Sequence, residues 1–187
     1  MAKIAVMGAG SWGTTFAKVL SDNEDNQVML WARREDVVEE INNSQRNGDY
    51  LPGVRLPKAL RASADIGEVL EGASLVFLAV PSQTLRGNLE QWSSLLPKDA
   101  ILVSLMKGVE KESGLRMSEV IASVANIDSD RIAVISGPNL ALEIAAGQPT
   151  ASVAASSNKE TAAKVAAAAT NDYFTTFTNK DVIGTEF

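Results

Sequence analysis

The sequence predicts an α/β fold, a doubly wound and mostly parallel sheet with helices on both faces. Short runs rich in Val, Ile and Leu alternate with longer segments of helical period along the whole chain. The length of 187 residues suits about one domain with a sizeable core. A content of 45% hydrophobic and 21% charged residues is typical of a globular protein and not of a disordered chain. We therefore expect a single folded domain over residues 1–187.

The expected elements alternate in the order that a parallel sheet requires. Strands are predicted at Lys3 to Met7, Gln27 to Ala32, Leu60 to Ser63, Leu75 to Val80, Ile101 to Ser104, Ile132 to Ser136, Thr150 to Ala155 and Tyr173 to Thr178. Helices are predicted at Ser11 to Ser21, Glu35 to Asn43, Gln83 to Leu95, Met117 to Ala125, Asn139 to Ala146 and Lys159 to Ala169. Ser157 followed by Glu160 suggests a capping box for the last helix. The Gly- and Pro-rich stretch 45–57 is predicted to be a loop over the end of the second strand.

Composition removes several classes of function. The chain has no Cys and no His, which excludes thiolate and Ser-His-Asp nucleophiles, disulfides and Cys/His zinc sites. Acid-base chemistry is therefore left to Lys, Asp, Glu or Tyr, and we expect no metal. A net charge of −6 has the wrong sign for a nucleic-acid partner. With no signal-peptide core and no apolar segment of about 20 residues, the sequence predicts a cytoplasmic protein without a membrane span.

A glycine motif follows the first predicted strand and opens the first predicted helix. Its glycines, Gly8, Gly10 and Gly13, have the GxGxxG spacing, and Ser11 and Trp12 lie between the last two. In this context Gly8 permits a tight turn, Gly10 lets the backbone approach a pyrophosphate, and Gly13 allows close packing of helix on strand. The motif predicts a Rossmann-type dinucleotide site. Trp12 either lines the cofactor or packs in the core.

The end of the second strand bears on the choice of cofactor. Sites for NAD carry an Asp or Glu there, which binds the ribose 2′-hydroxyl, but this sequence has Arg33 and Arg34. A guanidinium suits a 2′-phosphate, so NADP(H) is the preferred cofactor and NAD(H) a second choice. The alternative is that the two arginines are a solvated basic pair. Glu35 and Asp36 are read as first-turn helix residues favoured by the helix dipole.

Three other strand ends face the same edge of such a sheet. Pro81 is predicted to stop the fourth strand and free backbone donors near the nicotinamide. Lys107, beside Gly108, follows the fifth strand and is the best-placed group to polarise and protonate a carbonyl, although it would otherwise be an ordinary surface charge. Asn139, after Gly137 and Pro138, either fixes substrate hydroxyls or is a plain helix-start residue.

Taken together, these motifs resemble bacterial NAD(P)-dependent glycerol-3-phosphate dehydrogenases over the whole chain. The order of the motifs and the run from Ser136 to Glu143 make the resemblance specific. The segments that carry it are Gly8 to Gly13, Trp31 to Arg33, Tyr50 to Gly53, Ala79 to Ser82, Lys107 with Gly108, and Ser136 to Asn139.

The resemblance implies reversible reduction of dihydroxyacetone phosphate to sn-glycerol 3-phosphate, which supplies phospholipid synthesis. It implies that Lys107, Gly137 and Asn139 contact the substrate. It also implies that the dinucleotide is contacted by Ser11, Trp12, Arg33, Arg34, Lys107 and Ala141. The family has a C-terminal helical domain with the principal acid-base lysine, and this chain stops at Phe187, before that segment. We therefore expect the cofactor-binding domain alone, inactive by itself, with homodimerisation left open for the full-length enzyme.

Two rival functions share much of this pattern. Another two-domain dehydrogenase, of the ketopantoate or 6-phosphogluconate type, also often has an Arg after its second strand; Lys107 and the Gly137 to Asn139 run argue against it. A standalone nucleotide-sensing or redox-regulatory module would bind the cofactor but have no use for Lys107. About 140 further residues with a Lys-Asn pair soon after Glu186 would decide for the dehydrogenase.

Overall fold

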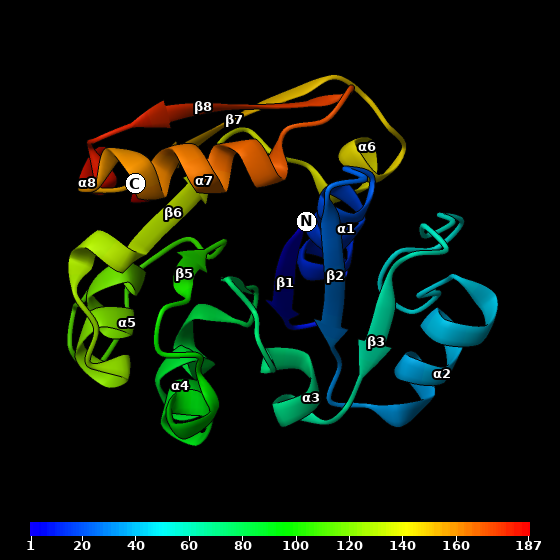
Figure 1. Ribbon diagram of the computed structural model, residues 1–187, viewed down its shortest axis with the longest axis horizontal. Helices are drawn as coiled ribbons and strands as arrows, with labels where there is room; N and C mark the ends of the chain where they lie inside the picture. Colours follow the sequence, from blue (N-terminus) through cyan, green and yellow to red (C-terminus); the bar gives the residue numbers. More distant parts are fainter.

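The computed structural model describes residues 1–187 and contains one eight-stranded sheet covered by helices (Figure 1). The sheet order is β3-β2-β1-β4-β5-β6-β7-β8, and every pair is parallel except β6 with β7. The strands are β1 (Ala2–Met7), β2 (Asn26–Trp31), β3 (Arg61–Ser63), β4 (Leu75–Leu78), β5 (Ile101–Ser104), β6 (Ile132–Ser136), β7 (Thr150–Ala155) and β8 (Phe174–Asn179). The predicted doubly wound α/β fold is confirmed.

Helices cover both faces of the sheet, and each face has its own core. The α-helices are α1 (Ser11–Ser21), α2 (Glu35–Ser44), α3 (Ile66–Leu70), α4 (Leu85–Trp92), α5 (Met117–Ala125), α6 (Ala141–Ala145), α7 (Lys159–Ala169) and α8 (Val182–Glu186). The larger core packs α1, α2, α6 and α7 on one face around Phe16, Phe77 and Phe174. The second packs α3, α4 and α5 on the other face around Trp92. None of the helices combines the length and hydrophobicity needed to cross a membrane.

The order of β1 and its neighbours decides where a ligand can bind. β1 pairs with β2 on one side and with β4 on the other, so the chain leaves β1 in one direction and later returns to its opposite edge. In open α/β sheets such a switch point leaves a crevice at the carboxyl ends of the two strands. The segments that follow β1 and β4 are therefore expected to form the site.

Several element boundaries differ from the sequence prediction. The helix expected from Gln83 to Leu95 is broken: 3₁₀ turns at Ser82–Thr84 and Ser93–Leu95 flank α4. β4 ends at Leu78, before Pro81, which makes the chain turn but does not stop the strand. The short helices α3 and α8 were not predicted, because five residues show no helical period; Asp65 and Asp181 cap them.

Two predictions about helix starts are wrong. Asn158, not Ser157, caps α7, since its side chain accepts hydrogen bonds from the backbone N–H groups of Glu160 and Thr161. The Ser157 hydroxyl instead donates to Asp130. The helix expected from Asn139 begins two residues later, at Ala141. Asn139 cannot start it, because its backbone N–H bonds back to the Gly137 carbonyl at 2.8 Å and its side chain reaches β7.

Candidate functional site

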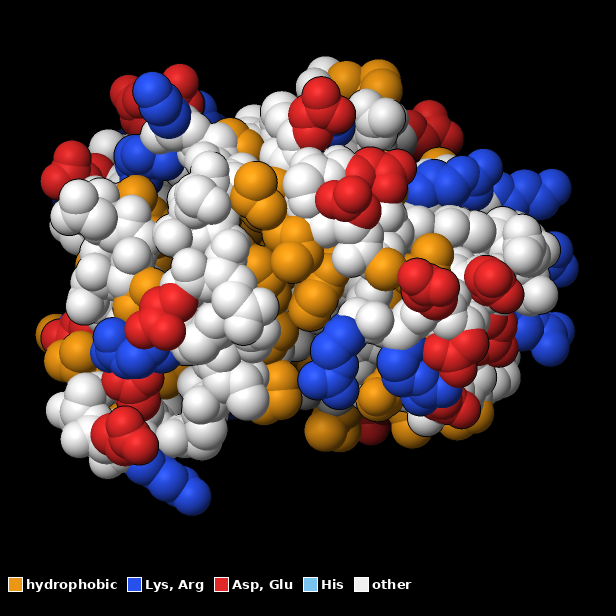
Figure 2. Space-filling view, turned by 90° about the horizontal axis from the view of Figure 1, so that it is seen from below, with side chains coloured by type: hydrophobic (Ala, Val, Ile, Leu, Met, Phe, Trp, Pro, Cys, Tyr) orange, Lys and Arg blue, Asp and Glu red, His pale blue; other side chains and the backbone are white.

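A cavity of about 760 Å³ lies at the carboxyl ends of the central strands. This is within the usual range of roughly 300 to 1,000 Å³ for small-molecule sites. Half of its 22 lining residues are hydrophobic. Figure 2 shows hydrophobic side chains gathered in a hollow on one face of the molecule, with Lys and Arg side chains beside it. The residues that line the cavity include Gly8 to Trp12 after β1, Trp31 to Arg34 at the end of β2, Ala79 to Ser82 after β4, Leu105 to Lys107 after β5, and Asn139 after β6.

The glycine motif forms the turn between β1 and α1. Gly8 has a φ of +124°, and a Cβ there would lie 2.7 Å from the Ala79 carbonyl oxygen after β4. A Cβ on Gly13 would lie 1.8 Å from the Gly8 carbonyl oxygen, so the helix approaches the turn more closely than any side chain allows. A Cβ on Gly10 would meet no atom within 4 Å, so the space in front of Gly10 is open. Gly8 and Gly13 thus shape the turn, and Gly10 leaves room for a ligand.

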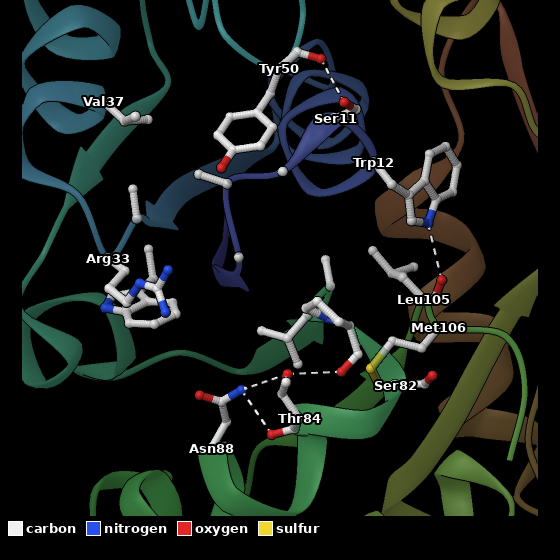
Figure 3. A pocket seen from close by; sticks show the side chains of 18 of the residues that line it. Ser11, Trp12, Arg33, Val37, Tyr50, Ser82, Thr84, Asn88, Leu105 and Met106 are labelled. Atoms are coloured by element: carbon white, nitrogen blue, oxygen red, sulfur yellow. Dashed lines mark hydrogen bonds between the residues drawn. The ribbon is translucent and has the colours of Figure 1, made fainter. Parts of the chain in front are cut away.

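The amino end of α1 points toward this open space. Gly10 caps the helix and contributes no side chain, so no side chain neutralises the free backbone N–H groups of the first turn. The Ser11 hydroxyl donates to the Tyr50 carbonyl at 2.6 Å, and the Trp12 indole N–H donates to the Leu105 carbonyl at 3.1 Å (Figure 3). Trp12 also packs edge-on against Phe16. It therefore does both things that the sequence left as alternatives, lining the cavity and packing in the core.

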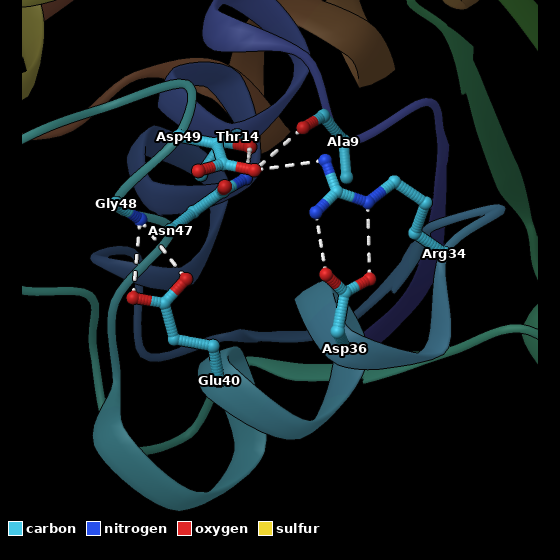
Figure 4. A network of polar contacts seen from close by, with 8 residues as sticks. All are labelled: Ala9, Thr14, Arg34, Asp36, Glu40, Asn47, Gly48 and Asp49. Atoms are coloured by element: carbon cyan, nitrogen blue, oxygen red, sulfur yellow. Dashed lines mark hydrogen bonds and ion pairs between the residues drawn. The ribbon is translucent and has the colours of Figure 1, made fainter.

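Arg33 and Arg34 both line the cavity at the end of β2, but their surroundings differ. Arg33 is exposed and makes no ion pair within the chain. Arg34 donates a fork to Asp36 and a further hydrogen bond to Asp49 at 2.8 Å (Figure 4). The hydrogen bond from Arg34 lowers the pKa of the Asp36 carboxyl. The two arginines are therefore not an equivalent pair: one is free and the other is held by carboxylates.

The three residues proposed to contact the substrate come together at the other end of the cavity. Lys107 Nζ donates a hydrogen bond of 2.9 Å to the Gly137 carbonyl. Asn139 lines the cavity, and its amide nitrogen lies 3.3 Å from the position of a Cβ on Gly137. The same nitrogen donates to the Ser152 hydroxyl at 3.1 Å, while Asn139 Oδ1 is buried without a hydrogen-bond partner. The unsatisfied amide oxygen of Asn139 and the remaining N–H groups of the Lys107 ammonium suit a polar ligand.

The remaining predicted residues take different positions. Pro81 lines the cavity and its carbonyl accepts hydrogen bonds from the Thr84 backbone and hydroxyl. Ala141 does not line the cavity; it lies in the first turn of α6, and its carbonyl accepts a hydrogen bond from Thr15 of α1. Gly13 and Gly137 are not among the residues that line the cavity either.

Sequence reasoning missed several lining residues. The Tyr50 ring points into the cavity from the 45–57 segment, as Figure 3 shows. Thr84 and Asn88 also line it, and the Asn88 amide donates to both the carbonyl and the hydroxyl of Thr84. The prediction of a loop over the end of the second strand could have suggested Tyr50. Thr84 and Asn88 had no such signal, because both fall inside a segment predicted as one continuous helix.

The cavity fits a dinucleotide. An open glycine backbone and an uncapped helix start suit a pyrophosphate, and a free guanidinium at the end of β2 suits a ribose phosphate. No group of three or more Asp and Glu side chains is placed to hold a metal ion.

Comparison with known proteins agrees with this geometry. Residues 3–162 match the family model described as NAD-dependent glycerol-3-phosphate dehydrogenase N-terminus. The chain is 56% identical to a glycerol-3-phosphate dehydrogenase [NAD(P)+] of Corynebacterium glutamicum, covering 100% of this chain and 56% of the relative. It is 57% identical to the protein of that name from Leifsonia xyli, covering 97% of this chain and 49% of the relative.

A solved structure is also similar. The crystal structure of glycerol-3-phosphate dehydrogenase from Coxiella burnetii superposes with a TM-score of 0.90 at 34% identity, covering 99% of this chain and 56% of that one. The chain thus spans about half the length of these relatives. The family match decides against the ketopantoate and 6-phosphogluconate types considered from the sequence. This chain belongs to the NAD-dependent glycerol-3-phosphate dehydrogenase family, and it matches the N-terminal part of that family.

Proposed function

We propose that residues 1–187 are the cofactor-binding part of an NAD(P)-dependent glycerol-3-phosphate dehydrogenase. The full-length enzyme would interconvert dihydroxyacetone phosphate and sn-glycerol 3-phosphate, the backbone for phospholipid synthesis. One observation carries the proposal: a single cavity joins the open turn at Gly10 to the ammonium of Lys107 and the amide of Asn139. A dinucleotide and a small polar substrate can therefore meet in it.

The positions proposed for the cofactor phosphates follow from the charges and the open space at that end of the cavity. The backbone at Gly10 and the first turn of α1 would hold the pyrophosphate, and Arg33 would hold a 2′-phosphate. When bound, the nicotinamide supplies or accepts the hydride. A charge-assisted hydrogen bond at a half-exposed site is worth the low end of about 1.5 to 3 kcal/mol, so we expect roughly a tenfold preference for NADPH over NADH.

The substrate end follows from the contacts of Lys107. Its ammonium is fixed by the Gly137 carbonyl and keeps other N–H groups free to bond and polarise a substrate carbonyl. Asn139 would orient a substrate hydroxyl. By resemblance the principal acid-base lysine lies in a C-terminal helical domain, so Lys107 would orient and polarise without completing the site. We therefore expect the chain alone to bind the cofactor and not to turn over substrate.

Calorimetric titration of the chain with NADPH and NADH, each with and without dihydroxyacetone phosphate, tests the proposal. We expect both cofactors to bind, with NADPH bound more tightly, and the Arg33→Ala variant to lose that difference. Arg55→Ala, an exposed arginine outside the cavity, is the matched control. A chain that binds neither cofactor, or an Arg33→Ala variant that prefers NADPH as strongly as before, would overturn this assignment.

A second measurement separates the dehydrogenase from a module that only senses the cofactor. The isolated chain is expected to reduce dihydroxyacetone phosphate far below the rates of roughly 1 to 10³ per second typical of enzymes. Tighter NADPH binding in the presence of dihydroxyacetone phosphate, lost in Lys107→Ala, would favour the dehydrogenase. An NADPH affinity that changes neither with dihydroxyacetone phosphate nor with Lys107→Ala would favour the sensor.

A further inference from the structure

The end of β2 carries two arginines, but only one of them is free to meet an anion. Arg34 makes three contacts with carboxylates, two with Asp36 and one with Asp49, whereas Arg33 makes none. Arg34 lines the cavity, but neither of the two carboxylates that bind it does. Figure 4 shows the guanidinium of Arg34 lying between the two acidic side chains.

The charges of this group explain why Arg34 is a weaker anion site than Arg33. Two carboxylates more than offset one guanidinium, and the three hydrogen bonds occupy most of its five N–H donors. A 2′-phosphate that recruited Arg34 would have to use the two remaining N–H donors or displace these contacts, and in either case it would approach two like charges. Arg33, one residue earlier in the chain, carries no such cost.

We propose that Asp36 and Asp49 are selectivity residues, which weaken the preference for NADPH over NADH by holding Arg34. The inference rests on the proposed function, since it assumes that a dinucleotide binds in this cavity. It assigns Asp36 a role beyond the favourable place of an acidic residue in the first turn of α2.

The exposure of the group sets the size of the effect. The side chains of Arg34, Asp36 and Asp49 are 47%, 66% and 59% exposed, and ion pairs this open to water are weak. The contacts therefore tune the preference and do not abolish NADPH binding. Releasing Arg34 should add about one charge-assisted hydrogen bond to the 2′-phosphate, roughly a tenfold gain in NADPH affinity with little change for NADH.

Asp49 also connects the selectivity residues to the segment over the cavity. It precedes Tyr50, whose ring lines the cavity and whose carbonyl accepts the Ser11 hydroxyl. In the same segment, the fully buried Asn47 donates to the Ala9 carbonyl and the Thr14 hydroxyl, and the Glu40 carboxylate accepts the Gly48 N–H. These contacts anchor the segment without Asp49. Replacing Asp49 should therefore free Arg34 and leave the segment in place.

The test compares affinities of the chain for NADPH and NADH in Asp36→Asn/Asp49→Asn and in a matched control. Glu35→Gln/Glu39→Gln also removes two negative charges, both from α2, and neither side chain forms an ion pair with Arg34. Adenosine 2′,5′-bisphosphate against 5′-AMP repeats the comparison with ligands that differ only in the 2′-phosphate. We expect the NADPH to NADH affinity ratio to rise about tenfold in the aspartate variant and roughly twofold or less in the control.

Adding Arg34→Ala to both variants identifies the cause. If the aspartates act by holding Arg34, the gain vanishes when Arg34 is absent. A gain that persists without Arg34, or one equal to that of the glutamate control, would overturn the proposal, because the effect would then be general electrostatics. A wild-type chain that binds neither cofactor nor adenosine 2′,5′-bisphosphate would instead overturn the proposed function itself. Thermal unfolding of each variant confirms that the comparison is made between folded proteins.

Discussion

Lys107 Nζ and the Gly137 carbonyl oxygen are joined by a hydrogen bond of 2.9 Å that crosses from the end of β5 to the end of β6. The bond holds an ammonium at the mouth of the cavity and leaves its other protons free. It also fixes the position of Lys107 relative to Asn139, two residues after Gly137. The two side chains proposed to meet the substrate are therefore placed by one contact.

Lys107→Ala should reduce the turnover of the full-length enzyme by about 10² to 10⁴-fold, the range for losing a positioned proton donor or polarising group. The fold should be unaffected, because the Lys107 side chain is exposed. Steady-state kinetics and the melting temperature measure the two effects. Lys111→Ala, on the same loop and with no side-chain partner, is the control. Near wild-type turnover in Lys107→Ala would show that Lys107 is only an ordinary surface charge.

Gly13→Ala and Gly10→Ala should have opposite signatures. A methyl group at Gly13 collides with the Gly8 carbonyl, so we expect a loss of about 1 to 3 kcal/mol or more in the free energy of unfolding. A methyl group at Gly10 meets nothing, so stability should stay within about 0.5 kcal/mol while NADPH affinity falls. Denaturant unfolding and calorimetric titration separate the two. The assignment of Gly10 to the pyrophosphate fails if Gly10→Ala binds NADPH normally.

Ser152 is predicted to position Asn139. The Ser152 hydroxyl is buried, donates to the Ser136 carbonyl at 2.9 Å and accepts from the Asn139 amide at 3.1 Å. Ser152→Ala removes both hydrogen bonds, so it should cost about 1 to 3 kcal/mol of stability and weaken the effect of dihydroxyacetone phosphate on NADPH binding.

Ser156→Ala provides the control for this loss of a hydrogen bond. Ser156 is also buried, donates to the Ile132 carbonyl at 2.7 Å, and lies at the other end of the β6 and β7 pair, away from the cavity. It should lower stability comparably and leave the substrate effect intact. Equal substrate effects in the two variants would show that Ser152 has a structural role only.

Glu110 should make stability depend on pH in the acid range. Hydrogen bonds from Arg86 and then from Ser113 lower the pKa of the Glu110 carboxyl in the folded protein. Since the unfolded value is about 4.3, the carboxylate stabilises the fold above that pH, and its contribution is lost as the pH falls through the lower folded pKa. Glu110→Gln should therefore be less stable at pH 7, with a difference that shrinks below about pH 4.3. Urea unfolding of the wild type and of Glu110→Gln across this pH range measures the difference.

The fold could be predicted from the sequence because a parallel sheet requires short apolar runs that alternate with helical segments, and both are visible locally. The buried runs of β4 and β6 and the glycine turn after β1 are visible without a structure. The ends of helices were harder, since they are decided by single side-chain contacts with distant residues. Asn139, for example, is not part of α6, because its side-chain amide is bound by Ser152 of β7.

Contacts with residues distant in the sequence also limit what could be predicted of the site. Lys107 and Asn139 follow strands, so sheet geometry alone brings them to one edge. Arg34 is held by Asp36 and by Asp49, and Asp49 lies on a loop whose path the sequence does not reveal. Tyr50 enters the cavity for the same reason, through the fold of that loop.

The antiparallel pairing of β6 with β7 bears on the order of folding. Ser136 pairs with Val153, 17 positions later in the chain, whereas Ile4 must find Leu75, 71 positions later, to form the centre of the sheet. Closing a short loop costs less chain entropy than closing a long one, and contacts between nearby residues form faster. The β6–β7 pair, whose connection carries Gly137 and Asn139, can therefore form before β1 and β4 pair and create the crevice. In a pulse-labelling hydrogen-exchange experiment, the amides of β6 and β7 would then gain protection earlier than those of β1 and β4.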